Sequence, residues 1–224
     1  MQARLFKAIE EGDVEAVVEL FEIDPDLVSG SNSEGASPLI WAAYYRRGKI
    51  VDLLMEHGAR PDIFEASALD LNDRVRDLLE SDRTLVDRYS FDGWTPLHLA
   101  AHFGSVDVLR TLLATGASHQ AVSRNSNGNQ PLQAAAAGRQ VEAVTLLLRV
   151  GADPDARSEG GFTALHSAAA SGDVELTRTL LEAGATVDVR ADGGKTPLEL
   201  AIEANHTAIV DLLEAAQDGL WNGT

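Results

Sequence analysis

The segment Thr95-Pro-Leu-His-Leu-Ala-Ala101 is one of five copies of a short pattern in this chain. The other four are Ser37-Pro-Leu-Ile-Trp-Ala-Ala43, Gln130-Pro-Leu-Gln-Ala-Ala-Ala136, Thr163-Ala-Leu-His-Ser-Ala-Ala169 and Thr196-Pro-Leu-Glu-Leu-Ala-Ile202. Their first residues lie 58, 35, 33 and 33 positions apart, taken in chain order. Self-similarity at a period near 33 predicts a repeat protein, in which each unit buries its apolar face against its neighbours.

A second apolar stretch begins about 15 residues after the start of each copy. These stretches are Ile50-Val-Asp-Leu-Leu-Met55, Val108-Leu-Arg-Thr-Leu-Leu113, Val144-Thr-Leu-Leu-Leu148, Leu176-Thr-Arg-Thr-Leu-Leu181 and Ile209-Val-Asp-Leu-Leu213. Two apolar segments per unit predict two short helices. The long gap holds a further unit at residues 64–79, and the N-terminus supplies another at residues 5–21. The chain is therefore expected to contain about seven units.

Helix boundaries are marked at both ends. A Ser or Thr hydroxyl caps the free amides of a first turn, and a following proline has no amide to leave unpaired. Ser37-Pro38, Thr95-Pro96 and Thr196-Pro197 fit this arrangement. The residue that ends a helix often has a left-handed backbone conformation, which glycine adopts most readily. First helices are expected to end at Gly12, Gly104 and Gly172, with Arg46, Asp70 and Asn205 replacing glycine, and second helices at Gly58, Gly116, Gly151 and Gly184.

Turn signals separate the units. A glycine stands shortly before the start of five of the first helices: Gly35, Gly93, Gly128, Gly161 and Gly194. A tight turn between short extended stretches predicts a β-hairpin.

A unit of two helices and a hairpin that carries the motifs Thr-Pro-Leu-His-x-Ala-Ala and Gly-Ala-Asp resembles the ankyrin repeat. The resemblance implies an α-helical solenoid of stacked helix-turn-helix units with β-hairpin fingers, forming a single domain over residues 1–224. We place the repeats at about 3–30, 31–60, 61–89, 90–123, 124–156, 157–189 and 190–217. Glu10, Glu11, Glu203, Gln217 and Asp218 give the first and last units the polar character of caps.

Two departures from the pattern affect the loops. Only about seven residues separate Met55 from the next first helix, against roughly 16 elsewhere, which predicts that the hairpin between units 2 and 3 is missing. After units 1 and 3, Asp24-Pro-Asp-Leu-Val28 and Asp82-Arg-Thr-Leu-Val86 replace glycine-alanine and predict an added turn.

Composition narrows the classes of function. The 224 residues carry a formal charge of −17 and no cysteine, which argues against nucleic-acid and anionic-membrane binding and excludes disulfides and zinc-thiolate sites. We see no signal peptide, because the N-terminus turns acidic at once, and no apolar run approaches the roughly 18 residues of a membrane span. These features predict a cytoplasmic protein.

Motifs for catalysis or metal binding are weak. His98 and His102 have the i, i+4 spacing of zinc ligands, but no third ligand completes the motif. His98 and His166 stand where the resemblance implies a structural histidine. Gly193-Gly-Lys-Thr196 lacks the first glycine of a phosphate loop. The carboxylates scatter over second helices, where a solvated face explains them. We expect no catalytic residue, metal or cofactor.

Aromatic side chains indicate a binding surface. Proteins similar to ankyrin repeats bind through the concave side of the stack, formed by the loop tips and the exposed ends of the first helices. Carried over to this chain, those positions hold Tyr44, Tyr45, Phe91, Trp94, His102 and Phe103. Because Tyr, Trp and Phe dominate interface hot spots, we expect a partner to centre on units 2 to 4. The alternative is that several of these rings cover a neighbouring unit.

Three arginines form a second candidate feature. Arg124, Arg157 and Arg190 recur every 33 residues and are expected to form a ladder on successive loops, selecting acidic groups on a partner. The alternative is internal pairing with Asp155, Asp188 and Asp192.

The sequence as a whole predicts a monomeric, non-catalytic module that binds another protein. One alternative is an enzyme or small-ligand protein that uses the groove, which requires a convergent polar pocket that the sequence does not reveal. Another is a fragment of a larger protein whose activity lies elsewhere.

Overall fold

A computed structural model describes residues 1–221. Over these residues fourteen α-helices form seven consecutive pairs. They are α1 (Gln2–Glu11), α2 (Val14–Ile23), α3 (Pro38–Tyr44), α4 (Gly48–Glu56), α5 (Ile63–Ala68), α6 (Asn72–Ser81), α7 (Pro96–Phe103), α8 (Val106–Thr115), α9 (Pro131–Ala137), α10 (Val141–Arg149), α11 (Ala164–Ser171), α12 (Val174–Glu182), α13 (Pro197–Glu203) and α14 (Thr207–Gln217). None of them is long and apolar enough to cross a membrane.

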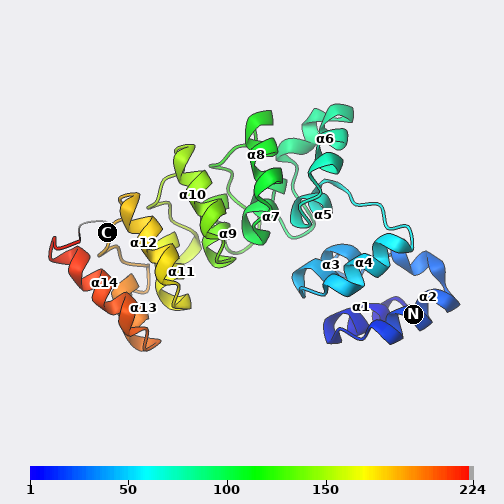
Figure 1. The fold of residues 1–224 in the computed structure, drawn as a ribbon, viewed down its shortest axis with the longest axis horizontal. Coiled ribbons are helices and arrows are strands. Elements are labelled where there is room, and N and C mark those ends of the chain that lie inside the picture. Colours follow the sequence, from blue (N-terminus) through cyan, green and yellow to red (C-terminus); the bar gives the residue numbers. More distant parts are fainter. Residues whose placement is uncertain (222–224) are drawn as a thin grey trace.

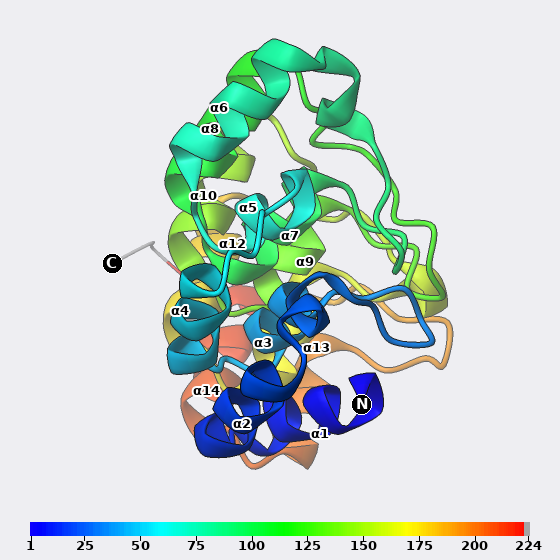
Figure 2. The ribbon, with the colours of Figure 1, turned by 90° about the vertical axis from the view of Figure 1, so that its right-hand side faces the viewer.

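The pairs stack into one elongated row, which confirms the predicted α-helical solenoid (Figure 1). The odd-numbered helices pack on one another in sequence order as an inner layer, and the even-numbered helices form an outer layer. Viewed along the row, the outer helices lie on one side and the loops between pairs on the other (Figure 2). The outer layer is interrupted once, because α4 and α6 lie apart while α3 and α5 stay in contact (Figure 1).

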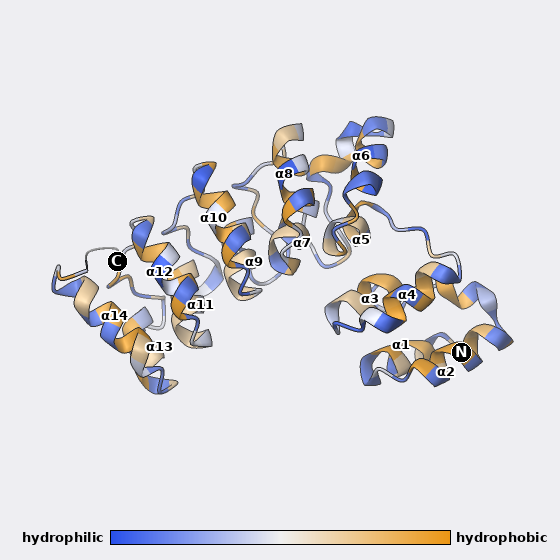
Figure 3. Ribbon diagram, viewed as in Figure 1, coloured by the Kyte–Doolittle hydropathy of each residue, from blue (hydrophilic) through white to orange (hydrophobic). Residues whose placement is uncertain are grey.

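The core is divided at the same place. One buried cluster is built from α1 to α4 and includes Leu5, Leu39 and Leu54, and a second runs from α5 to α14. A third, smaller cluster joins them on the inner side, where Ile40 of α3 packs with Trp94. Hydrophobic and hydrophilic residues alternate along the helices (Figure 3), and the buried core is made mainly of the hydrophobic ones.

The predicted helix ends are confirmed. The hydroxyls of Ser37, Thr95 and Thr196 accept hydrogen bonds from first-turn amides, with the proline at the first helical position. The expected glycines have positive φ, and the non-glycine substitutes do too: Arg46 at 54°, Asp70 at 56° and Asn205 at 59°. In unit 5 the left-handed residue is Arg139, at 59°.

The loops differ from the predicted hairpins, because no strand forms within residues 1–221. Each of the five loops instead folds back as a turn closed by a backbone hydrogen bond, for example from Ser90 N to Trp94 O (2.8 Å) and from Ala191 N to Lys195 O (2.9 Å). Neighbouring turns are also bonded to each other, as from Arg124 N to Gly93 O (2.8 Å). Pairing this short does not extend into a β-ladder.

The predicted missing loop is confirmed. Only residues 57–62 connect α4 to α5, and they contain no turn of this kind. The predicted added turns are also present, as the short 3₁₀ segments η1 (Pro25–Ser29) and η2 (Arg83–Asp87); a third segment, η3 (Glu159–Gly161), lies within a turn. The row of turns therefore has a gap beside α5.

Candidate binding site

The gap in the row of turns holds a pocket. It has a volume of about 280 Å³ and lies between the first turn, at Gly35, and the turn that contains Phe91 and Asp92. The side chains that give it its chemistry are those of Tyr44, Asp62, Glu65, Arg88, Tyr89, Phe91 and Asp92. We call it the α5 pocket. The small-ligand reading of the sequence required such a convergent polar pocket, and the sequence did not reveal it.

Tyr44 and Asp92 connect the two sides of the pocket. The Tyr44 hydroxyl, at the end of α3, donates a hydrogen bond to Asp92 Oδ2, and the Ser90 hydroxyl donates to Asp92 Oδ1. Burial and the neighbouring Asp92 carboxylate raise the pKa of Tyr44, so the hydroxyl keeps its proton and remains a donor. This contact ties unit 2 directly to unit 4.

Glu65 lies on the floor of the pocket and is 8% exposed. Its Oε2 accepts a hydrogen bond from Asp62 N (2.8 Å), and its Oε1 accepts one from the Ser37 hydroxyl. Burial raises the pKa of this carboxyl group above its usual value. Glu65 stands at the third position of its helix, where His98, Gln133 and His166 stand in units 4 to 6. Those three residues donate to the next loop, which an ionised carboxylate cannot do.

Trp94 is buried, so it does not lie exposed on the binding surface that the resemblance implies. The side chain is 8% exposed and belongs to the third cluster, with Ala36, Ile40 and Ala43. Its ring stacks on His98 at 6.1 Å and meets the edge of His102 at 5.1 Å. Phe162 occupies the same place before the cap of α11 and is 42% exposed. Trp94 differs because the missing loop lets unit 2 pack against it.

The other predicted rings separate into two groups. Tyr44, Phe103 and His102 form a contacting series, with ring centroids 5.3 Å apart for Tyr44 and Phe103 and 5.1 Å for Phe103 and His102. Tyr45 and Phe91 remain free to meet a partner, with 41% and 42% of their surface exposed. The structure thus brings four of the six residues into one partly buried cluster, while the Tyr45 ring lies 5.4 Å from the Trp41 ring and Phe91 lines the α5 pocket.

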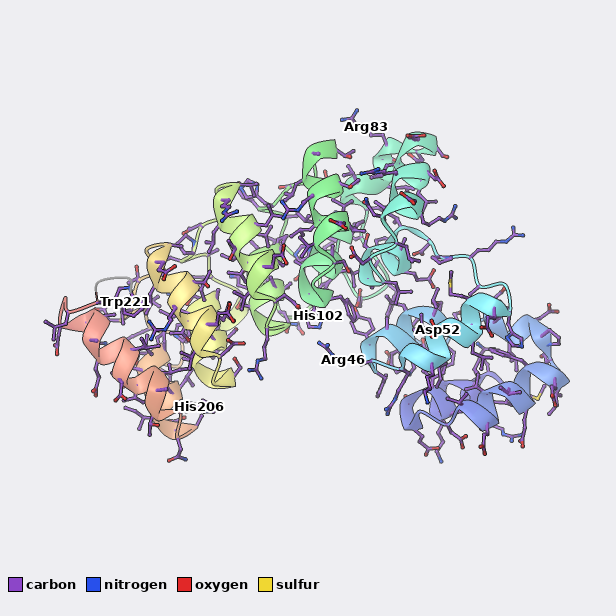
Figure 4. The ribbon with its side chains drawn as sticks, in the orientation of Figure 1. Arg46, Asp52, Arg83, His102, His206 and Trp221 are labelled. Carbon is purple, nitrogen blue, oxygen red and sulfur yellow. The ribbon has the colours of Figure 1, made fainter. Side chains whose placement is uncertain are left out.

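His102 lies near the end of α7, and Arg46, which follows α3, lies close to it (Figure 4). Its Nδ1 is 3.3 Å from the carbonyl oxygen of Ala134. Burial lowers the pKa of His102, and the positive charge of Arg46 lowers it further. His98 is the other residue of the possible zinc pair. Both of its ring nitrogens form hydrogen bonds, Nδ1 with Thr95 and Nε2 with the carbonyl of Asn129. The two histidines therefore act in packing.

The three arginines lie exposed on successive loops, and each contacts its own chain. The Arg124 guanidinium lies 3.8 Å from the centre of the Tyr89 ring. Arg157 donates to the carbonyl of Arg190 (2.9 Å) and to Asp192 Oδ1 (3.2 Å). Arg190 donates to the carbonyl of Gly194 (2.6 Å) and lies 3.7 Å from Glu199. Internal pairing is thus observed with Asp192 and not with Asp155, which accepts from Thr186 instead.

Sequence reasoning missed five of these pocket residues, namely Asp62, Glu65, Arg88, Tyr89 and Asp92. A signal was available for Glu65, because alignment of the units places a carboxylate where histidine or glutamine stands in units 4 to 6. No periodic signal marks Arg88 or Tyr89, which follow the added turn η2.

Stacked pairs of short helices, joined by turns on one side, define the class of α-helical repeat scaffolds. The family model described as ankyrin repeats in three copies matches residues 63–158 and 142–219, and the single ankyrin repeat model matches residues 34–65. The chain belongs to the ankyrin repeat family. Ankyrin repeats are protein–protein interaction modules, and that class of function applies here.

Relatives share parts of this chain. A putative ankyrin repeat protein of fowlpox virus (FPV014) is 34% identical over 168 residues, which are 70% of this chain and 37% of that protein. The serine/threonine-protein kinase VIK of Arabidopsis thaliana is 42% identical over 73 residues, 33% of this chain and 16% of the kinase. The palmitoyltransferase AKR1 of Lachancea kluyveri is 31% identical over 146 residues, 60% of this chain and 20% of the enzyme. The chain thus covers well under half of each of these relatives.

Proposed function

We propose that this chain is a non-catalytic module that binds another protein through its loop side, centred on the α5 pocket. The observation that carries the proposal is that Phe91 lines the α5 pocket, that Tyr45 directly follows Tyr44, which also lines it, and that both rings are more than two-fifths exposed. Large rings of this kind give up much apolar surface when a partner covers them, and such rings dominate interface energetics.

The other residues predicted to bind a partner shape the surface or lie at its rim in this proposal. Trp94, Tyr44, His102 and Phe103 pack on one another and hold the surface in shape. Arg124, Arg157 and Arg190 lie along the adjoining loops, where their exposed guanidinium groups add positive charge at the rim of the interface. The partner's core contacts therefore fall on units 2 to 4 and its rim contacts on units 5 to 7.

The absence of catalysis is part of the proposal. The Ser37 and Ser90 hydroxyls in the pocket donate to carboxylates, and no histidine is among its described lining residues to activate them. The match to the palmitoyltransferase covers a fifth of that enzyme, so its activity does not carry over to this chain.

The proposal is tested by capturing a partner through cross-linking and mass spectrometry and then measuring its affinity for variants. Tyr45→Ala and Phe91→Ala should each weaken binding by about tenfold or more, because each removes an exposed ring without opening the core. Phe162→Ala is the matched control, since Phe162 is as exposed as Phe91 but lies on the loop of unit 6, among the rim contacts, where truncation should cost little affinity. Equal affinity for all three variants and the parent would refute the site.

A further inference from the structure

We propose that the α5 pocket receives a positively charged side chain, lysine or arginine, from the partner protein. This inference rests on the proposed function and adds to it the chemistry of the partner's central contact. It starts from the missing loop, which leaves room beside α5 for a pocket lined by Gly35 and Phe91; the turns that hold them come close together, since a Cβ atom on Gly35 would lie 3.4 Å from Phe91 Cβ.

The charges that face the pocket select a cation. Three carboxylates line it, those of Asp62, Glu65 and Asp92, against one basic group, that of Arg88. Arg88 and Asp62 are exposed, whereas Glu65 is buried and Asp92 is half-buried, so two of the three carboxylates lie deeper than the basic group. With a formal charge of −17, the chain as a whole also repels anions.

The carboxylates have room for another donor. The hydrogen bonds to Glu65 come from Asp62 N and the Ser37 hydroxyl, and those to the Asp92 side chain from the Tyr44 and Ser90 hydroxyls. A carboxylate has about four lone-pair sites, so two such bonds leave capacity on each group. All of these donors are neutral, and among the described residues neither carboxylate forms an ion pair with a basic side chain.

The walls suit the aliphatic part and the charge of such a side chain. Tyr44, Phe64, Tyr89 and Phe91 contribute aromatic rings. The protein already uses one of them in this way, because the Arg124 guanidinium lies 3.8 Å from the centre of the Tyr89 ring. The volume of about 280 Å³ is just below the range of about 300–1,000 Å³ for pockets that hold drug-sized ligands, and it suits one inserted side chain.

The test titrates the isotope-labelled protein with N-acetyl-lysine methylamide and records amide chemical shifts. The matched probe is N-acetyl-norleucine methylamide, which keeps the aliphatic chain and lacks the charge. N-acetyl-arginine methylamide tests the second cation. We expect saturable shifts around Glu65, Tyr89 and Asp92 with the two cationic probes and none with norleucine.

Variants connect the shifts to the carboxylates. Asp92→Asn and Glu65→Gln should each lower the affinity of the protein for the lysine probe by about fivefold, since each removes one charge and keeps an acceptor oxygen. Gln133 occupies the position of Glu65 in unit 5, which supports the folding of the Glu65→Gln variant. Asp211→Asn on the exposed face of α14 is the control and should leave the affinity unchanged.

The outcomes separate this inference from the proposed function. No saturable shift at the pocket, equal shifts with norleucine, or equal affinities in Asp92→Asn, Glu65→Gln and the parent would each overturn the cation site. A partner that loses affinity in Tyr45→Ala and Phe91→Ala while the lysine probe fails to bind would keep the protein-binding function and reject the pocket contact. A probe that binds as expected while the partner is insensitive to Phe91→Ala would instead reject the proposed interface.

Discussion

His98 Nε2 lies 3.0 Å from the carbonyl oxygen of Asn129, so the first helix of unit 4 is bonded to the loop that leads into unit 5. His98 Nδ1 accepts from Thr95 N (3.3 Å), which places the proton on Nε2 and makes it the donor. Gln133 Nε2 donates in the same way to Ala156 O (2.7 Å), and His166 Nε2 to Lys195 O (3.1 Å). One side chain per unit thus fixes the next loop.

The stability of the fold should fall as the pH falls below about 6.5. Burial lowers the pKa of His98 to about 4, so the unfolded chain takes up a proton at a higher pH than the folded one. Stability is therefore complete above the unfolded pKa and is lost as the pH falls toward 4. For His98 the loss at pH 5 is about 2 kcal/mol. The lowered pKa of His166 acts in the same direction.

The measurement is urea unfolding at pH 7 and pH 5 for the parent and His98→Gln. Glutamine cannot titrate, and Gln133 makes the equivalent bonds in unit 5, so the variant should lose about 2 kcal/mol less between the two pH values. The raised pKa of Glu65 opposes the histidines, because a carboxyl group with a raised folded pKa stabilises at low pH. Its effect is common to both proteins and cancels. An identical pH dependence would contradict the assignment.

Trp94 should be a stability residue. Trp94→Ala removes a buried ring from the third cluster and is expected to cost about 3–5 kcal/mol. Phe162→Ala, at the same place in unit 6, removes a ring that is 42% exposed and should cost clearly less. Denaturant unfolding of both variants measures the difference. Equal small losses would mean that the Trp94 ring is not packed between the units.

Much of the fold could be predicted from the sequence because its determinants are local. Caps such as Thr95-Pro96 and left-handed residues such as Asp70 act within one turn and leave a mark at a fixed place in each unit. The burial of Trp94 could not be predicted in this way. Trp94 and Phe162 look equivalent in sequence, and the approach of Ala36, Ile40 and Ala43 from unit 2 buries the first of them.

The candidate site could be predicted only in part, because some of its determinants are local and others are contacts between units. The short connection before Phe64 predicted the missing loop, but the pocket that results combines groups from units 2, 3 and 4. The pairing of Tyr44 with Asp92 joins residues 48 positions apart, and no repeat period relates them. Contacts that cross an irregular place in a solenoid leave no periodic trace in the sequence.

Gly138 should be intolerant of any side chain. A Cβ atom there would lie 2.0 Å from the carbonyl oxygen of His102, a backbone atom that cannot turn away. Gly138→Ala is therefore expected to separate α9 from α7 and to lower the melting temperature by several degrees. Gly48→Ala is the control, because a Cβ there meets open space at the start of α4. It should be neutral or stabilise by about 0.5–1 kcal/mol. Similar melting temperatures for the two variants would contradict the close contact.

The arginine ladder should matter more for association than for stability. Arg157 and Arg190 form exposed pairs, and such pairs contribute about 0–1 kcal/mol each. Replacing Arg124, Arg157 and Arg190 together with alanine should slow association with the partner and flatten its dependence on salt. The control replaces Arg76, Arg110 and Arg149, which lie on outer helices and change the net charge equally. If both triple variants behave alike, the loop arginines serve internal contacts alone.

The divided core predicts that the chain does not unfold as one unit. The cluster built from α1 to α4 meets the cluster from α5 to α14 through the small third cluster and through Leu69 at the end of α5, while α4 and α6 lie apart. In a solenoid, stability is a sum over units and their interfaces, so a weak interface allows one side to open alone.

Leu54→Ala provides the test, measured by hydrogen exchange of backbone amides under native conditions. Leu54 is fully buried in the first cluster, and its truncation is expected to cost about 3 kcal/mol. Protection should fall in α1 to α4 and stay unchanged in α9 to α12. Leu147→Ala in α10 is the converse control and should lower protection from α7 to α12 while α1 to α4 exchange as in the parent. A uniform loss of protection along the chain in Leu54→Ala would show a single cooperative unit and contradict the division.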